Sequence, residues 1–169
     1  KLIRAIENAK SDTPVAESLL PPITSRSQVI HLRPLPTDTI RQVLVEDKGV
    51  PVEQAELLAR LSGGRMGWAL RAVQDEGILE QRTTALDLLE QLLRLNRAQR
   101  FEIAEDLSKD KLALYPLLEL WQTYWRDVLL LCQRANHIPV NSDRAEAIRQ
   151  LAGVVGADEA LNALQATRT

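Results

Sequence analysis

The sequence predicts a mostly all-α protein whose first part is the end of an α/β module. Five of the eight prolines lie within the first 36 residues, together with the only stretch typical of a β-strand, residues 29–32. Beyond Pro36, apolar residues recur at intervals of three and four, the spacing of amphipathic helices. We therefore expect three parts: the end of an α/β module over residues 1–35, a three-helix bundle over 36–76 and a longer helical bundle over 77–169.

Composition and charge limit the classes of protein to which this chain can belong. Hydrophobic residues make up 45% of the 169 positions, as in globular proteins, and a net charge of −2 gives no basic surface for unaided nucleic-acid binding. The single cysteine, Cys132, excludes an intrachain disulfide and fits a cytoplasmic protein. The longest apolar run, residues 128–132, is far too short to span a membrane. Because the chain starts at Lys1 without a methionine or a signal peptide, we expect it to be a piece of a longer protein.

The segment before the predicted strand contains an arginine that follows a conformationally restricted stretch of backbone. Pro21 and Pro22 fix their own backbone angles and disfavour a helix, and Ser25-Arg26-Ser27 follows them. An arginine held in this way offers its planar set of donors to a phosphate at low entropic cost. For an isolated arginine the alternative is an ordinary surface ion pair with a carboxylate.

Residues 37–75 predict three short helices. Thr37 is the expected N-cap of the first, which ends at Gly49. The second starts near Pro51 and stops at residues 62–64, and the third follows directly. The apolar faces that would pack together are formed by Ile40, Val43, Leu44, Ala55, Leu58, Ala59, Met66, Trp68, Ala69, Leu70, Ala72 and Val73.

The rest of the chain predicts longer helices. Leucines recurring from Leu79 to Leu93 indicate a helix packed on several sides, broken near Asn96. The longest helix tolerates Pro116 because this proline lies near its start, and Ser142 or Asp143 is expected to cap a later one. The four further helices are expected over residues 101–107, 111–136, 142–152 and 157–166.

Few residues point to catalysis. The chain has no Gly-x-x-x-x-Gly-Lys-Ser/Thr loop for nucleotide phosphates and no Gly-x-Ser-x-Gly nucleophile turn. His31 and His137 are the only histidines, and no acidic cluster at ligand spacing accompanies them, so we expect no metal site. Gly63-Gly64 could open an anion-binding helix, but a helix-terminating turn explains both glycines. We do not expect the chain to be an enzyme by itself.

An aromatic stretch is predicted to be core. Trp121, Trp125 and Val128 recur at helical spacing, with Arg126 and Asp127 expected to hydrogen-bond to other helices. The alternative is an aromatic platform on which nucleic-acid bases stack, which the lack of a basic surround disfavours.

Three segments in this order resemble the AAA+ clamp-loader family of DNA replication. Residues 19–36 resemble the family's Ser-Arg-Cys segment at the end of its ATPase module, with Ser27 in place of the cysteine. Residues 58–70 resemble the lid helices that carry the sensor-2 motif. Residues 121–129 resemble the long helix of the collar, the domain through which five subunits form a ring. On this resemblance the three parts are the ATPase end, the lid and a collar that we expect to be truncated.

The resemblance implies that Arg26 acts in trans, as an arginine finger toward ATP and Mg bound by a neighbouring subunit, with Ser25 and Ser27 holding the turn. Trp121 and Trp125, with Arg126 and Asp127, would then pack the collar. The implied partners are gamma/tau and delta subunits in a hetero-pentamer, with the sliding clamp and primer-template DNA reached through the assembled complex. No cofactor is implied for this chain itself.

Position 67 departs from the pattern of the ATP-hydrolysing members, which read Gly-x-x-Arg at sensor 2. Here Gly64-Arg65-Met66-Gly67 places a glycine where the nucleotide-contacting arginine belongs. Arg65 lies two positions earlier, about 200° around a helix, and so cannot simply replace it. The chain therefore resembles a subunit that does not hydrolyse ATP. The alternatives are an ATP-hydrolysing gamma/tau-type subunit and a helical adaptor unrelated to replication.

Overall fold

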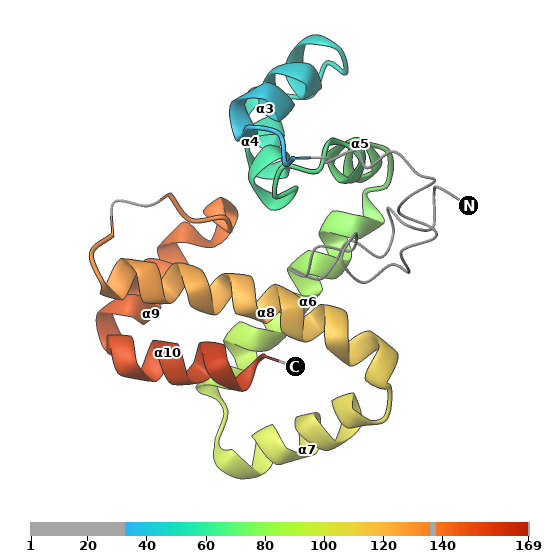
Figure 1. Cartoon of the computed structure of the whole chain (residues 1–169). Coiled ribbons are helices and arrows are strands. Elements are labelled where there is room, and N and C mark those ends of the chain that lie inside the picture. Colours follow the sequence, from blue (N-terminus) through green and yellow to red (C-terminus); the bar gives the residue numbers. More distant parts are fainter. Residues whose placement is uncertain (1–32, 136–137, 169) are drawn as a thin grey trace, which may run out of the picture. The chain divides into compact units, whose positions relative to one another are not determined.

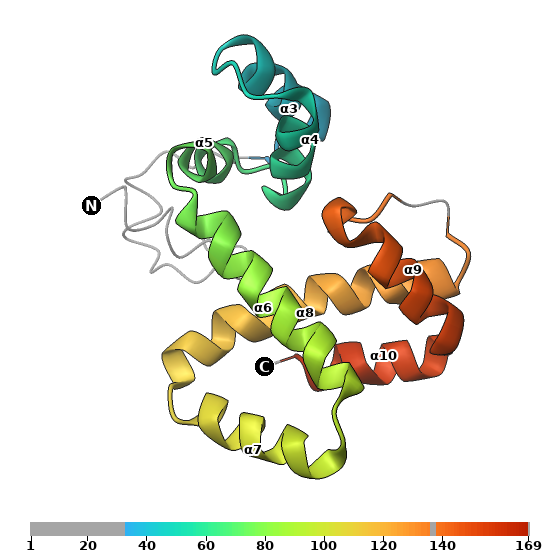
Figure 2. The same ribbon diagram turned by 180° about the vertical axis from the view of Figure 1, so that it is seen from behind.

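The structure, a computed structural model, describes residues 33–135 and 138–168. The chain divides into two units, residues 1–33 and 34–169, and all described residues except Arg33 belong to the second. Every regular element in the described residues is helical, with eight α-helices and one short 3-10 helix (Figures 1 and 2). The expectation of a mostly all-α protein is thereby confirmed. The predicted strand 29–32 and the Ser25-Arg26-Ser27 turn lie outside the described residues.

Three short helices share the first hydrophobic core: α3 (Thr37–Glu46), α4 (Val52–Leu61) and α5 (Met66–Gln74). We call them the N-terminal cluster. Its buried side chains are Ile40, Leu44, Val50, Ala55, Leu58, Ala59, Ala69 and Ala72. All but Val50 belong to the predicted apolar faces; Val50 lies between two helices, where helical periodicity gives no signal.

The start of α3 differs from the prediction. Pro36, not Thr37, occupies the N-cap position, and no side chain caps the helix. Pro36 has a φ of −57°, so it enters the first turn with the backbone angle that its ring imposes. Its carbonyl accepts the first helical hydrogen bond, from the Ile40 N–H at 3.2 Å. Thr37 is therefore the first residue of the helix.

The remaining helices form a second core around α8 (Lys111–Cys132). α8 contacts α6 (Gly77–Arg94), α7 (Arg97–Ser108), α9 (Ala145–Val154) and α10 (Ala157–Ala166). We call this group the C-terminal cluster. Its buried hydrophobic residues are Leu86, Leu89, Trp121, Tyr124, Trp125, Val128, Ile148 and Ala160.

α8 ends four residues before the predicted limit of 136. Arg134 has a φ of +53°, the left-handed conformation that usually selects glycine. The Ala135 N–H then donates to Leu130 O at 3.0 Å and the Arg134 N–H to Leu131 O at 2.9 Å. These two bonds are the Schellman pattern that closes a helix. The sequence has no glycine here, so it did not indicate that α8 ends at this point.

Two other helix boundaries also differ. Asn96 was expected only to interrupt the helical pattern, but it forms a capping box with Gln99 at the start of α7. Neither Ser142 nor Asp143 caps α9 through its side chain, since both lie in a 3-10 turn, η1 (Ser142–Arg144), that precedes the helix. Among the described residues, no helix is both long and apolar enough to cross a membrane.

Candidate functional site

The turn between α4 and α5 contains the residues that resemble a sensor-2 motif. Ser62 is fully buried; its hydroxyl donates to Ala59 O at 2.7 Å and accepts from the Gly64 N–H at 3.3 Å. Gly63 and Gly64 have φ values of +56° and +84°. The helix-terminating turn predicted for the two glycines is therefore confirmed. The structural role of Ser62 was not foreseen.

Gly64 also holds the chain that enters the N-terminal cluster. The Leu35 N–H donates to Gly64 O at 2.9 Å. A Cβ atom added at position 64 would lie 2.4 Å from Pro34 Cβ and 2.9 Å from Pro34 Cα. Only glycine fits this approach, because the contact is with backbone and a rigid ring. The segment that follows the predicted strand is thus attached directly to the sensor-2-like turn.

Arg65 does not lie in the helix, contrary to the angular argument from the sequence. It is the N-cap of α5, with extended backbone angles of −99° and 91°. Its exposed side chain turns back, so that Nε donates to Ser62 O at 2.8 Å. Arg65 therefore differs from the helical residue at position 67 in its extended backbone and in its bond to the turn.

Gly67 is an exposed residue in the first turn of α5. A Cβ atom placed there would meet nothing within 4 Å, and the backbone needs no positive φ. Packing therefore does not require glycine at this position.

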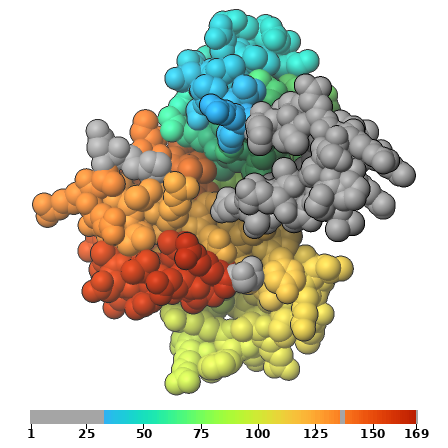
Figure 3. Space-filling model, in the orientation of Figure 1, coloured from blue at the N-terminus to red at the C-terminus, as the bar shows by residue number. Residues whose placement is uncertain are grey.

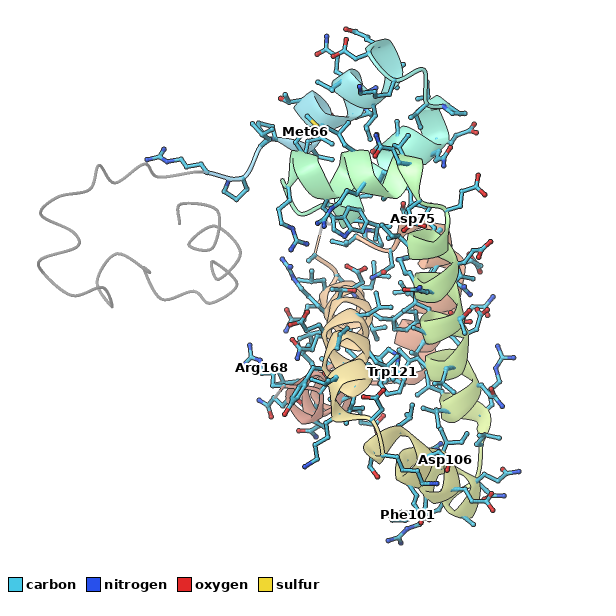
Figure 4. The ribbon with its side chains drawn as sticks, turned by 90° about the vertical axis from the view of Figure 1, so that its right-hand side faces the viewer. Met66, Asp75, Phe101, Asp106, Trp121 and Arg168 are labelled. Carbon is cyan, nitrogen blue, oxygen red and sulfur yellow. The ribbon has the colours of Figure 1, made fainter. Side chains whose placement is uncertain are left out.

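The aromatic residues around Trp121 and Trp125 of α8 are core, as predicted. Trp121, Tyr124 and Trp125 are at most 8% exposed. The Trp121 indole N–H donates to Ala85 O at 2.9 Å, and Figure 4 shows the ring between α8 and α6. Rings buried in this way have no free face on which a base could stack. The prediction that Arg126 packs with these residues is wrong, because its side chain is exposed.

Asp127, the other polar residue singled out on α8, is fully buried. Its carboxylate accepts from the backbone N–H of Val140 at 3.1 Å, from the N–H of Asn141 at 2.9 Å and from Asn141 Nδ2 at 2.8 Å. These partners lie in the loop before η1, not in another helix as expected. The hydrogen bonds compensate the cost of burying the carboxylate.

The same loop leads to a buried arginine. Arg82 of α6 is 8% exposed, and its Nη2 donates to Asn141 Oδ1 at 2.8 Å. The Arg82 guanidinium also donates to both carboxylate oxygens of Asp143, from Nη1 to Oδ2 at 2.7 Å and from Nη2 to Oδ1 at 2.9 Å. A two-pronged pair of this kind fixes both position and orientation. Arg82, Asn141 and Asp143 thus join α6 to the segment before α9. Neither Arg82 nor Asn141 was singled out in the sequence, because residues so far apart give no local pattern.

A second group of charges continues from η1. Arg144 pairs with Asp87 at 2.7 Å and lies 3.7 Å from Glu90. Glu90 Oε1 accepts from the Tyr124 hydroxyl at 3.4 Å. Burial, and then the negative charge of Glu90, raises the pKa of the Tyr124 phenol well above its usual range. Tyr124 therefore acts as a neutral hydrogen-bond donor at physiological pH.

Comparison with protein-family models, curated proteins and solved structures finds no match for this chain.

The described residues contain no group of three or more His, Cys, Asp or Glu side chains arranged to hold a metal ion. The sensor-2-like residues Gly64, Arg65 and Gly67 come together in one turn, and Trp121, Trp125 and Asp127 come together in the core of the C-terminal cluster. Arg26, Ser25 and Ser27 lie outside the described residues.

Proposed function

We propose that this chain is part of a clamp-loader subunit that does not hydrolyse ATP itself, of the delta-prime type in bacterial DNA polymerase III. In this proposal Arg26 stabilises the charge that develops on the γ-phosphate of ATP bound by a neighbouring subunit. Residues 36–76 form the lid and residues 77–169 part of the collar. The assembled ring uses ATP binding and hydrolysis to load a sliding clamp on primed DNA.

The observation that carries the proposal is the start of α5. A lid that contacts its own nucleotide needs a cation projecting from this helix turn, but position 67 is glycine although the space around it is open. Arg65, the residue that precedes α5, is bonded back to Ser62 O at 2.8 Å. This arrangement favours a subunit without nucleotide turnover of its own over the ATP-hydrolysing gamma/tau type.

The attachment at Gly64 supports the same proposal. An arginine finger acts only if its position is fixed within a few tenths of an ångström to an ångström. The chain that follows the Arg26 segment is held by the Leu35–Gly64 hydrogen bond of 2.9 Å and by the contact of Pro34 with Gly64.

The test is the clamp- and DNA-stimulated ATPase rate of a loader reconstituted with the full-length form of this chain, with and without Arg26→Ala. We expect hydrolysis at one neighbouring site to slow by about 10³-fold, as for other arginine fingers. Arg33→Ala, an exposed arginine on the same segment, is the matched control and should leave the rate unchanged. Gel filtration shows whether the ring assembles. An unchanged rate for Arg26→Ala in an assembled ring would refute the arginine-finger role, and failure to associate with any clamp-loader subunit would favour an unrelated helical adaptor.

A further inference from the structure

A groove of about 550 Å³ lies between α6, α7 and α8. Its apolar surface is formed mainly by four partly exposed leucines: Leu88, Leu107, Leu114 and Leu117. In the space-filling view the yellow-green α7 lies beside the yellow start of α8 (Figure 3). Apolar surface gathered in a groove, rather than scattered singly, is typical of a binding site.

The charges along the groove have one sign. Glu80, Asp106 and Asp110 line it, and no lysine or arginine does so within the described part of the chain. Asp106 forms an exposed ion pair with Lys109 at 2.6 Å, so its charge is partly balanced, whereas no ion pair is formed by Glu80 or Asp110 in the described residues. Asp110 caps α8 by accepting from the N–H groups of Leu112 and Ala113. The groove therefore combines an apolar floor with an acidic rim.

α7 is poorly supported by the rest of the protein. None of its residues is buried, and Phe101 on its surface is 63% exposed (Figure 4). Its first turn carries Arg97 and Arg100, and its last turn carries Glu105 and Asp106. This order opposes the helix dipole, which favours acidic residues at the start and basic residues at the end. Lys109, the C-cap residue, offsets this mismatch in part, and further cations near the end of α7 would reduce it more.

We propose that this groove binds a basic amphipathic helix of a partner protein. Apolar side chains spaced along one face of that helix would enter the leucine floor, as in other helix-in-groove complexes. Its flanking lysines or arginines would meet Glu80, Asp106 and Asp110. The sign of the rim excludes an acidic helix as the preferred occupant, since like charges would be brought together. This inference does not rest on Arg26 or on the clamp-loader proposal.

The test uses the whole chain and two fluorescent peptides that differ only in charge. One is an amphipathic helix of leucine, alanine and lysine, and the other has glutamate in place of every lysine. We expect the lysine peptide to bind at least tenfold more tightly, as measured by fluorescence anisotropy. Reversing the rim with Glu80→Lys and Asp106→Lys together should weaken binding of the lysine peptide at least fivefold. Circular dichroism of each variant checks that the helices are retained.

A second double variant provides the matched control. Glu146→Lys with Glu159→Lys changes the net charge equally at exposed positions on α9 and α10, outside the groove. It should leave the affinity within twofold of the unchanged chain. Equal weakening by both double variants would mean that the peptide senses only net charge and would overturn the proposal. No binding of the lysine peptide, or equal binding of both peptides, would overturn it as well.

Discussion

Arg82 and Asp143, separated by 61 positions in the sequence, form two hydrogen bonds of 2.7 and 2.9 Å. The arginine is 8% exposed, whereas the side chain of Asp143 is 29% exposed. Replacing Asp143 by alanine would leave a buried positive charge without its carboxylate, which is strongly destabilising. With a discount for the solvent that reaches Asp143, we expect Asp143→Ala to lower the free energy of unfolding by about 2 kcal/mol.

Chemical denaturation measures this loss, and an exposed ion pair provides the control. Glu146, in its pair with Arg149, is 69% exposed, so Glu146→Ala should cost less than about 1 kcal/mol. The double variant Arg82→Met with Asp143→Ala should lose less than the sum of the two single changes, since it removes the buried charge. Equal effects of Asp143→Ala and Glu146→Ala would contradict the structural role of Arg82.

Gly64→Ala should destabilise the N-terminal cluster more than any other glycine-to-alanine change there. The new methyl group would combine a φ of +84° with an approach of 2.4 Å to Pro34 Cβ. Gly49 has a similar φ of +67° but open space around it, so Gly49→Ala carries the backbone strain alone. We expect a cost of about 1 kcal/mol for Gly49→Ala and at least twice that for Gly64→Ala. Thermal unfolding of both variants measures the difference, and similar losses would show that Pro34 moves aside freely.

Gly67→Arg should be tolerated and should slightly stabilise the protein. The position is helical and exposed, and an added Cβ meets no atom within 4 Å. Arginine is favoured over glycine in a helix by up to about 1 kcal/mol, of which the positive end of the helix dipole removes a part. The expected gain is about 0.5 kcal/mol in denaturant unfolding. A clear loss of stability would show that the fold requires glycine at position 67. The glycine would then no longer favour a subunit that does not hydrolyse ATP.

Tyr124 should make the protein less stable at alkaline pH. In the folded protein its pKa is raised by burial and by Glu90, while in the unfolded chain it ionises near pH 10. The stabilising effect of the neutral phenol is therefore complete below about pH 10 and declines as the pH rises further, by about 1.4 kcal/mol per unit. Unfolding of the unchanged chain and of Tyr124→Phe across this range measures the slope that Tyr124 adds.

Tyr115, the other tyrosine, is 51% exposed, so Tyr115→Phe leaves a tyrosine signal from Tyr124 alone. In a spectroscopic titration of this variant, Tyr124 should ionise only as the protein unfolds, because burial and Glu90 raise its pKa. Ionisation of Tyr124 near pH 10 in the folded protein would contradict the burial of its hydroxyl beside Glu90.

Prediction from the sequence was most successful where apolar spacing decides the structure. Ile40, Leu44, Ala55 and Leu58 were identified as one core because residues three and four apart lie on the same helix face. Predictions failed where a boundary depends on one backbone conformation. Arg134 takes the left-handed conformation that ends α8, although nothing about an arginine indicates it.

The candidate site was predictable only in its local parts. The turn at residues 63–64 follows from two adjacent glycines, which sequence reasoning recognises. Its close contact with Pro34 could not be foreseen, because it joins segments that are distant in sequence. The same holds for the bonds of Asn141 to Arg82 and to Asp127.

One helix belongs to both hydrophobic cores. Ile78 and Leu79 at the start of α6 pack on the N-terminal cluster, and Leu86 and Leu89 are buried in the C-terminal cluster. α6 contains no proline and no glycine after its first residue, and it is roughly 27 Å long at 1.5 Å per residue. Such a helix is stiff. A rotation of its first turn would therefore also rotate the residues that are buried in the C-terminal cluster, instead of bending the helix between the two cores.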